Sequence, residues 1–110
     1  MIAVQFIFSQ ASYDDEFYEL DNSIADFAKS LPGHVGVEKW LSEDGTSQNS
    51  IYYFTDRDAL AQLAGFSDHL TAKSKVDNWY SSYQVVVTEV LASYGSSKPA
   101  HISSGQVNTG

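Results

Sequence analysis

The sequence predicts an α+β fold of the ferredoxin-like kind, a βαββαβ sandwich in which a four-stranded antiparallel sheet carries its helices on one face. Two observations lead to this prediction. Runs with strand character alternate with runs of helical periodicity in the order β-α-β-β-α-β. The stretch from Ser50 to Leu91 also reads as an aromatic strand, a broken helical segment and a Val-rich strand, and the part before it looks like a second copy of that unit.

The first strand is expected over residues 1–8, where β-branched and aromatic residues make both alternating faces apolar. Val4, Phe6 and Phe8 share one face, and Ala3 and Ile7 share the other. A strand with two apolar faces is covered on both sides.

A helix is expected to open at Ser12, because Ser12 and Asp15 form a near capping box at an acidic first turn. Pro32-Gly33 ends it. The apolar positions follow the spacing of one helix face and are Phe17, Leu20, Ile24, Phe27 and Leu31. The positions expected to face water are Asp15, Glu19, Asn22, Asp26 and Lys29.

The remaining elements follow in the same order. A strand over residues 34–41 is joined by an Asp-Gly turn, a strong hairpin signal, to a partner over residues 50–55. Thr55 is expected to cap a helix whose Leu60, Leu63 and Ala64 face inward and which Gly65 interrupts. A third short helix is expected over about residues 68–76 and the last strand over residues 83–91.

Composition indicates one domain and excludes several classes of partner. Of 110 residues, 43% are apolar, and six basic against fourteen acidic residues give a net charge of −8. This charge repels phosphate backbones and anionic headgroups, so neither nucleic acid nor a membrane is expected as a partner. The absence of cysteine excludes disulfides and thiolate sites.

The chain ends are interpreted from their composition. The apolar start lacks a positively charged region and is interrupted by Gln5, so it is interpreted as a strand and the protein is expected in the cytoplasm. No apolar run approaches the ~18 residues that a membrane helix needs. The domain is expected over residues 1–92, and the Ser- and Gly-rich tail over residues 93–110 is predicted to be flexible.

A homodimer is expected because two helices can cover only one face of the sheet. The strands are apolar on both faces, with Ile51 and Tyr53 on one and Tyr52 and Phe54 on the other. An exposed apolar face of that size marks an interface, and a second copy packed sheet to sheet would cover it. The alternative is that the tail alone folds over this face.

Features spread over nearly the whole domain resemble one known family. In chain order they are Pro32-Gly33 and Gly36, the run from Trp40 to Gly45, the aromatic run over residues 52–54 with the helix opening that follows it, His69, Trp79-Tyr80, Tyr83, and valines up to Glu89-Val90. Their order and spacing are similar to those of the antibiotic biosynthesis monooxygenase (ABM) domain family of dimeric α/β barrels. The resemblance implies a small homodimer with a pocket between helices and sheet. Some such proteins oxidise aromatic polyketides or quinols with oxygen and no cofactor, some degrade heme, and many have no known substrate.

The sequence also departs from the patterns of this family. The heme-degrading branch pairs a helix histidine, matched by His69, with a strand asparagine and a helix tryptophan. Here the first strand has no asparagine and residues 59–66 have no tryptophan. The polyketide-oxidising branch adds an arginine to such residues, and the sole arginine of this chain is Arg57, at a helix start. The resemblance therefore carries over His69 alone.

His69 is the candidate catalytic residue, since an imidazole in an apolar pocket can act as base, as donor to an oxygen intermediate or as heme ligand. Its alternative is a structural histidine at a helix start. The candidate substrate-binding residues are aromatic side chains that can stack on a planar molecule. They are Tyr53, Trp79, Tyr80 and Tyr83. The alternative is that these side chains belong to the core.

The function expected first is an ABM-like oxygenase that acts, without a cofactor, on an aromatic or quinol-like molecule between helices and sheet. The alternative is a non-catalytic binding or stress-associated module of the same fold, and heme degradation is a distant third. No metal site is predicted, because His34 and Glu38 share a strand face but lie ~13 Å apart at ~3.3 Å per residue.

Overall fold

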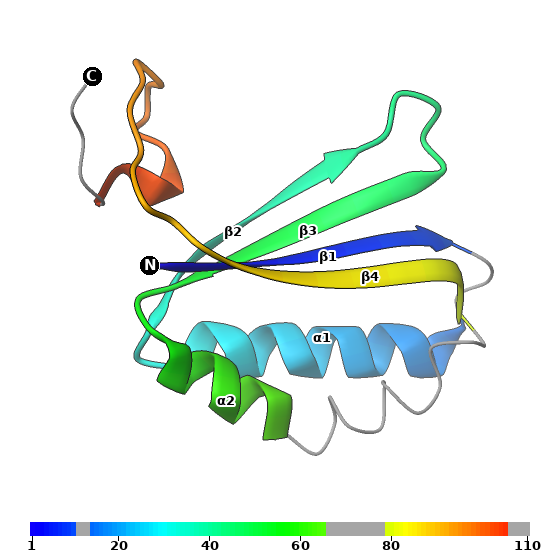
Figure 1. The fold of residues 1–110 in the computed structure, drawn as a ribbon. Helices are drawn as coiled ribbons and strands as arrows, with labels where there is room; N and C mark the ends of the chain where they lie inside the picture. The colour runs from blue at the N-terminus through cyan, green and yellow to red at the C-terminus, as the bar shows by residue number, and fades with distance from the viewer. Residues whose placement is uncertain (11–13, 66–78, 106–110) are drawn as a thin grey trace.

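The structure is a computed structural model that describes residues 1–10, 14–65 and 79–105 (Figure 1). Four strands form one sheet in the order β2-β3-β1-β4, in which every neighbouring pair is antiparallel. The predicted ferredoxin-like α+β fold is confirmed. Its elements are β1 (Ile2–Gln10), α1 (Asp15–Ser30), β2 (His34–Leu41), β3 (Ser47–Phe54), α2 (Arg57–Gly65), β4 (Tyr80–Glu89) and the 3₁₀ helix η1 (Ile102–Gly105).

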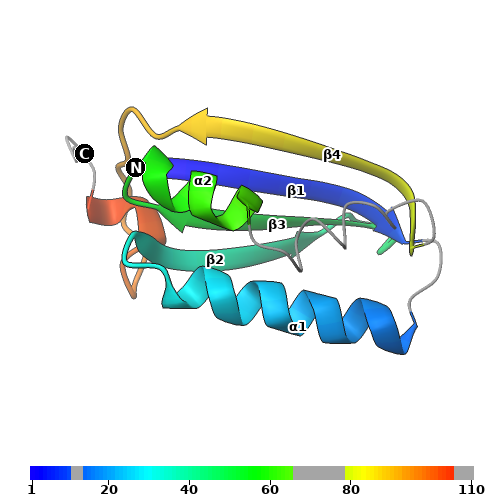
Figure 2. The same cartoon turned by 90° about the horizontal axis from the view of Figure 1, so that it is seen from below.

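Both α-helices lie on one face of the sheet (Figures 1 and 2). Seen from the helix side, α1 and α2 lie beside each other and β4 runs along the edge farthest from α1 (Figure 2). We call the side of the sheet that carries α1 and α2 the helix face, and the other side the open face. No helix in the described part of the chain is both long and apolar enough to cross a membrane.

The pairing register decides which side chains meet the helices. Val4 of β1 lies opposite Tyr52 of β3, and Ala3 lies opposite Tyr53. Because successive strand residues point to opposite faces, Val4 and Tyr52 belong to the helix face, and Ala3 and Tyr53 to the open face. The register shifts in β2 between His34 and Gly36.

The core lies between the sheet and the helices. Phe54, Leu63 and Val4 are its largest completely buried side chains. Its other buried members are Ile2, Ala28, Leu31 and Ala59. The predicted stripe of α1 is confirmed: Phe17 and Leu31 are buried, while Leu20, Ile24 and Phe27 are half-buried. All five positions of α1 predicted to face water are exposed.

Both helices are capped one or two residues later than predicted, in each case by an aspartate. The Asp14 carboxylate, in place of the predicted Ser12, accepts a hydrogen bond from the backbone N–H of Phe17 at 2.8 Å and caps α1. At α2 the Asp56 carboxylate accepts from the N–H of Ala59 at 3.4 Å. The predicted cap, Thr55, lies one residue before Asp56, and its N–H donates to the carbonyl of Gly33 at 2.7 Å.

The predicted hairpin between β2 and β3 is confirmed. Gly45 has a φ of +75°, a conformation that glycine tolerates, and its N–H donates to the carbonyl of Ser42 at 2.9 Å. The Asp44 carboxylate accepts from the Ser42 hydroxyl at 2.8 Å. β3 begins at Ser47, earlier than predicted, because its pairing with β1 continues to Ser9. The predicted third helix lies outside the described residues.

Part of the tail packs on the open face (Figure 1). Ile102 is half-buried and Ser103 is buried. The rest of the open face carries polar and apolar side chains in alternation, including Gln5 and Asn49, whose amides hydrogen bond at 3.0 Å. It is therefore less apolar than the sequence predicted.

Replacing Phe27 by Ala should lower the free energy of unfolding by about 2–4 kcal/mol, because a half-buried ring against the core is lost. Replacing the neighbouring exposed Asp26 by Ala should change it by less than about 0.5 kcal/mol. Urea denaturation of both variants measures the difference. Equal losses would contradict the orientation of α1.

Candidate functional site

Three of the predicted substrate-binding aromatics meet at one end of the sheet. Tyr83 lies opposite Phe8 in the register between β4 and β1, which places it on the helix face. Ring centroids are separated by 4.8 Å between Phe8 and Tyr80 and by 6.5 Å between Tyr80 and Tyr83. Phe17 of α1 closes the group, at 5.3 Å from Trp79 and 6.0 Å from Tyr80. We call these five residues the aromatic cluster.

The aromatic cluster runs from the interior to the surface. Trp79 is 2% exposed and Tyr83 is 51% exposed, with half-buried Tyr80 between them. Aromatic rings in offset or edge-to-face contact stabilise one another and keep their orientation. A planar molecule could therefore reach Tyr83 and Tyr80, while Phe17 contacts both Tyr80 and the buried Trp79.

Asp14 fixes the buried end of the aromatic cluster. The same carboxylate oxygen, Oδ1, that caps α1 also accepts a hydrogen bond from the Trp79 indole Nε1–H at 3.2 Å. This bond joins the start of α1 to the start of β4 across the 65 positions that separate the two residues. The indole N–H of a buried tryptophan needs such a partner.

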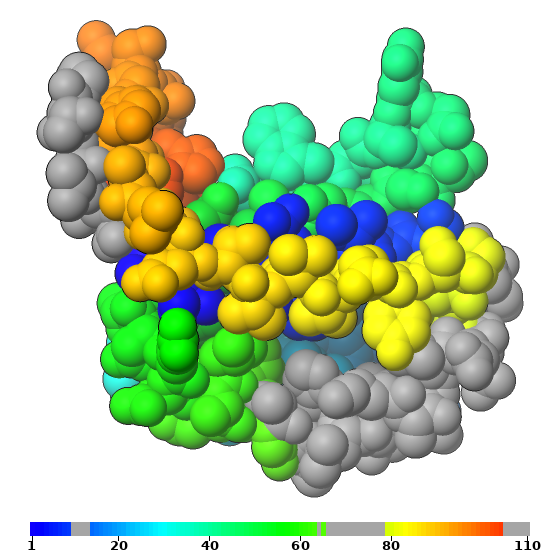
Figure 3. Space-filling model, in the orientation of Figure 1, coloured from blue at the N-terminus to red at the C-terminus, as the bar shows by residue number. Residues whose placement is uncertain are grey.

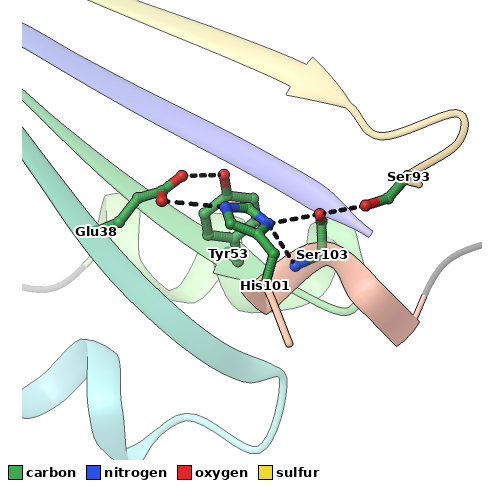
Figure 4. A network of polar contacts seen from close by, with 5 residues as sticks. All are labelled: Glu38, Tyr53, Ser93, His101 and Ser103. Atoms are coloured by element: carbon green, nitrogen blue, oxygen red, sulfur yellow. Dashed lines mark hydrogen bonds and ion pairs between the residues drawn. The ribbon is translucent and has the colours of Figure 1, made fainter. Parts of the chain in front are cut away.

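Tyr53, the fourth predicted substrate-binding residue, lies apart from the other three. It faces the open side of the sheet, is 6% exposed, and its hydroxyl donates to Glu38 Oε1 at 2.5 Å (Figure 4). Its neighbour Tyr52 does face the helices, where it packs edge-on against Phe6 at 5.7 Å. Burial, and then the Asp21 carboxylate, raise the pKa of Tyr52, so its hydroxyl stays protonated.

A second group of polar side chains surrounds Tyr53. His101 Nε2 lies 3.1 Å from Glu38 Oε2, and His101 Nδ1 lies 2.7 Å from the Ser103 hydroxyl, which contacts the Ser93 hydroxyl at 2.6 Å (Figure 4). The Tyr53 and His101 rings meet edge to face at 5.8 Å. We call these five residues the tail network, because three of them come from the tail.

The tail network defines the tautomer of His101. The backbone N–H of Ser103 donates to His101 Nδ1 at 3.1 Å, so this nitrogen is an acceptor. The proton of the neutral ring then sits on Nε2 and points at Glu38. Burial alone would raise the pKa of Glu38, but the hydrogen bonds from Tyr53 and His101 outweigh it and hold that pKa below its ordinary value.

The arrangement of hydroxyl, imidazole and carboxylate serves to anchor the tail. A nucleophilic serine needs open space beside its oxygen, and Ser103 is only 7% exposed. Burial first, and then Glu38, raise the pKa of Tyr53 strongly, so Tyr53 is a permanent donor to the carboxylate. Composition gave no signal for the tail network, since it depends on a contact between positions 38 and 101.

The structure leaves the catalytic prediction untested. His69 lies outside the described residues. Within residues 1–10, 14–65 and 79–105, no group of three or more His, Cys, Asp or Glu side chains could hold a metal ion. Among these residues, the aromatic cluster is the part of the predicted site that the fold assembles.

Comparison with known proteins gives similarity of fold. No family model and no curated protein matches the chain. Among solved structures, SnoaB, a cofactor-independent oxygenase from Streptomyces nogalater, is 18% identical with a TM-score of 0.64, over 81% of this chain and 91% of SnoaB. A Nitrosomonas europaea protein with a provisional assignment as an antibiotic biosynthesis monooxygenase is 19% identical with a TM-score of 0.64, over 83% of this chain and 99% of its own.

A third similar structure belongs to a different group. A dabb family protein with a ferredoxin-like fold from Mesorhizobium loti is 14% identical with a TM-score of 0.55, over 82% of this chain and 96% of its own. The likeness in fold to ABM-type structures that the sequence predicted is thus confirmed.

Replacing Asp14 by Ala should shift the fluorescence of Trp79 to longer wavelength, because its indole loses its partner and the start of α1 loosens. The measurement uses a Trp40→Phe background, which leaves Trp79 as the one tryptophan. Asp56→Ala is the matched control, since it removes a helix cap that touches no tryptophan. Identical spectra for the two variants would contradict the role of Asp14.

Proposed function

We propose that this protein is a small ABM-like oxygenase that acts, without a cofactor, on an aromatic or quinol-like molecule bound between the helices and the sheet. The observation that supports it is the aromatic cluster, which lies on the helix face and opens to solvent at Tyr83. Its fold is shared with SnoaB, which is described as a cofactor-independent oxygenase.

In this proposal Tyr80 and Tyr83 stack on the planar substrate, and Phe17, which contacts both Trp79 and Tyr80, holds Tyr80 in place. His69 takes a proton from the substrate. The carbanion that results gives one electron to molecular oxygen, and the substrate radical and superoxide combine into a peroxide, so the substrate itself supplies the reducing power. Tyr53 has no place in this pocket, because it lies on the other face of the sheet with its hydroxyl bonded to Glu38.

A second candidate function is a binding module of the same fold with no reaction. One observation favours it: the carboxylate that contacts the aromatic cluster, Asp14, already caps α1 and holds Trp79. Both bonds serve the fold, so this carboxylate already has a structural role. The two candidates differ in whether oxygen is consumed.

Oxygen uptake against a panel of quinols and anthrones should reveal turnover, and His69→Ala should lower the rate by roughly 10²–10⁴ if His69 is the proton acceptor. Tyr83→Ala should raise KM because a stacking face is lost, whereas Tyr94→Ala, at an exposed tyrosine of the tail, should change neither constant. Substrate binding without oxygen uptake would favour the binding module. A fully active His69→Ala variant would contradict the assignment of the base.

Titration of the purified protein with heme tests the third function. Since heme degradation requires heme to bind, an unchanged Soret band would eliminate it. A shifted band that His69→Ala abolishes would favour it over the oxygenase.

The proposal includes a homodimer in the cytoplasm, with no nucleic acid or membrane as a partner. Trp40 supports the dimer, because it lies on the open face and is 62% exposed. Exposed aromatic side chains on a sheet face are typical of interfaces. A second copy packed on this face would cover Trp40.

The protein should sediment as a dimer of about 24 kDa at micromolar concentration, twice the 12.1 kDa of one chain. Trp40→Glu should weaken the dimer at least tenfold, because a charge would enter the interface. Leu41→Glu is the matched control, since Leu41 is 70% exposed and points to the opposite face. Sedimentation velocity over a range of concentrations measures both, and a wild-type protein that stays monomeric would contradict the dimer.

A further inference from the structure

The chain beyond β4 crosses to the open face, where it forms η1 (Figure 1). We call residues 91–105 the strap. It rises above one end of the open face, while the hairpin between β2 and β3 rises above the other (Figures 1 and 3). The sheet pairing stops just before it, where the N–H of Val90 donates to the carbonyl of Met1 at 2.9 Å.

The strap touches the sheet at a small area around Gly36. A Cβ atom on Gly36 would lie 3.2 Å from the Ile102 side chain, so the glycine makes the room in which Ile102 packs. Next to it, His101 contacts Glu38 and the Tyr53 ring. These contacts, together with Ser103, close the strap over Tyr53.

The rest of the strap is loosely packed. Leu91 is 82% exposed and Tyr94 is 62% exposed. A hollow of about 210 Å³ lies within the strap, and the described residues that line it all belong to the strap: Ser93, Tyr94, Gly95, Ser97, Ala100, His101 and Ser104. A segment with few buried apolar contacts opens locally at a lower free energy than the domain unfolds.

We propose that the strap is a releasable closure over the Gly36 end of the open face, fastened by the Glu38 carboxylate, and that neutralising this carboxylate frees the strap while the sheet stays folded. Glu38 is the central member of the tail network, because its two oxygens bind Tyr53 and His101 separately. Hydrogen bonds to an ionised carboxylate are stronger than those to a neutral group. Release would expose Tyr53 and the sheet around it.

The charges around Glu38 define the pH response. Tyr53 from β3 and His101 from the strap are the titratable groups that contact it, and the Trp40 indole adds a hydrogen bond. The other ionisable side chains of the strap, Tyr94 and Lys98, are exposed. With the strap in place the pKa of Glu38 lies below its ordinary 4.5. The stabilisation is therefore complete above pH 4.5 and lost as the pH falls through the lowered value.

Hydrogen exchange of the full chain, followed by mass spectrometry, tests this proposal. Glu38→Gln should speed exchange in the strap about tenfold, the loss expected for one charge-assisted hydrogen bond, and leave β1 unchanged. Glu43→Gln, an exposed carboxylate in the hairpin turn, is the matched control. After correction for intrinsic rates, strap exchange in the wild type and in Glu43→Gln should rise as the pH falls below 4.5, and the rise should be smaller in Glu38→Gln.

Two results would overturn the proposal. In the first, hydrogen exchange in the strap is as slow in Glu38→Gln as in Glu43→Gln. In the second, the strap and β1 exchange at the same rate in every variant. If Glu38→Gln does not fold, Gly36→Ala tests whether the strap can open while the sheet stays folded, because its Cβ displaces Ile102 without changing any charge. A strap that stays protected in Gly36→Ala would also count against a releasable closure. None of these results depends on oxygen uptake.

Discussion

The register of β1 between β3 and β4 is the constraint on which the rest of the structure depends. β1 is paired on both sides, so its alternation fixes the faces of its neighbours: Val4 lies opposite both Tyr52 and Val87, and Ala3 lies opposite Tyr53 and Thr88. A slip of one residue would exchange the two faces and move Val4 out of the core. The core, the aromatic cluster and the position of the tail network all follow from this pairing.

The sequence predicted the architecture well, because the architecture follows from periodicity. The alternation in β1, the stripe from Phe17 to Leu31 and the Asp-Gly turn are local patterns, and each is present in the structure. The helix starts were less predictable, since Ser12-x-x-Asp15 and Asp14 offer competing caps within a few residues. The carboxylate of Asp14 gains a second partner, the Trp79 indole, which no local pattern reveals.

The candidate site could be predicted only in part, because contacts between distant positions leave no local pattern in the sequence. Trp79, Tyr80 and Tyr83 are near neighbours in sequence, and the fold brings them together with Phe8 and Phe17. Tyr52 and Tyr53 both belong to an aromatic run, but strand alternation sends them to opposite faces. The tail network joins positions 38 and 101, 63 residues apart, and a Ser-rich tail gives no sign of such a contact.

The aromatic cluster and the tail network lie on opposite faces of the same sheet. The aromatic cluster lies at the end where β1 reaches Phe8, on the helix face, and the tail network lies near Ala3, on the open face. The paired strands β1, β3 and β4 carry the two groups on opposite faces and near opposite ends. A loss of strap closure with an intact aromatic cluster is thus the behaviour that this fold favours. The proposed reaction and the strap can then change separately, because the side chains proposed for each leave the sheet in opposite directions.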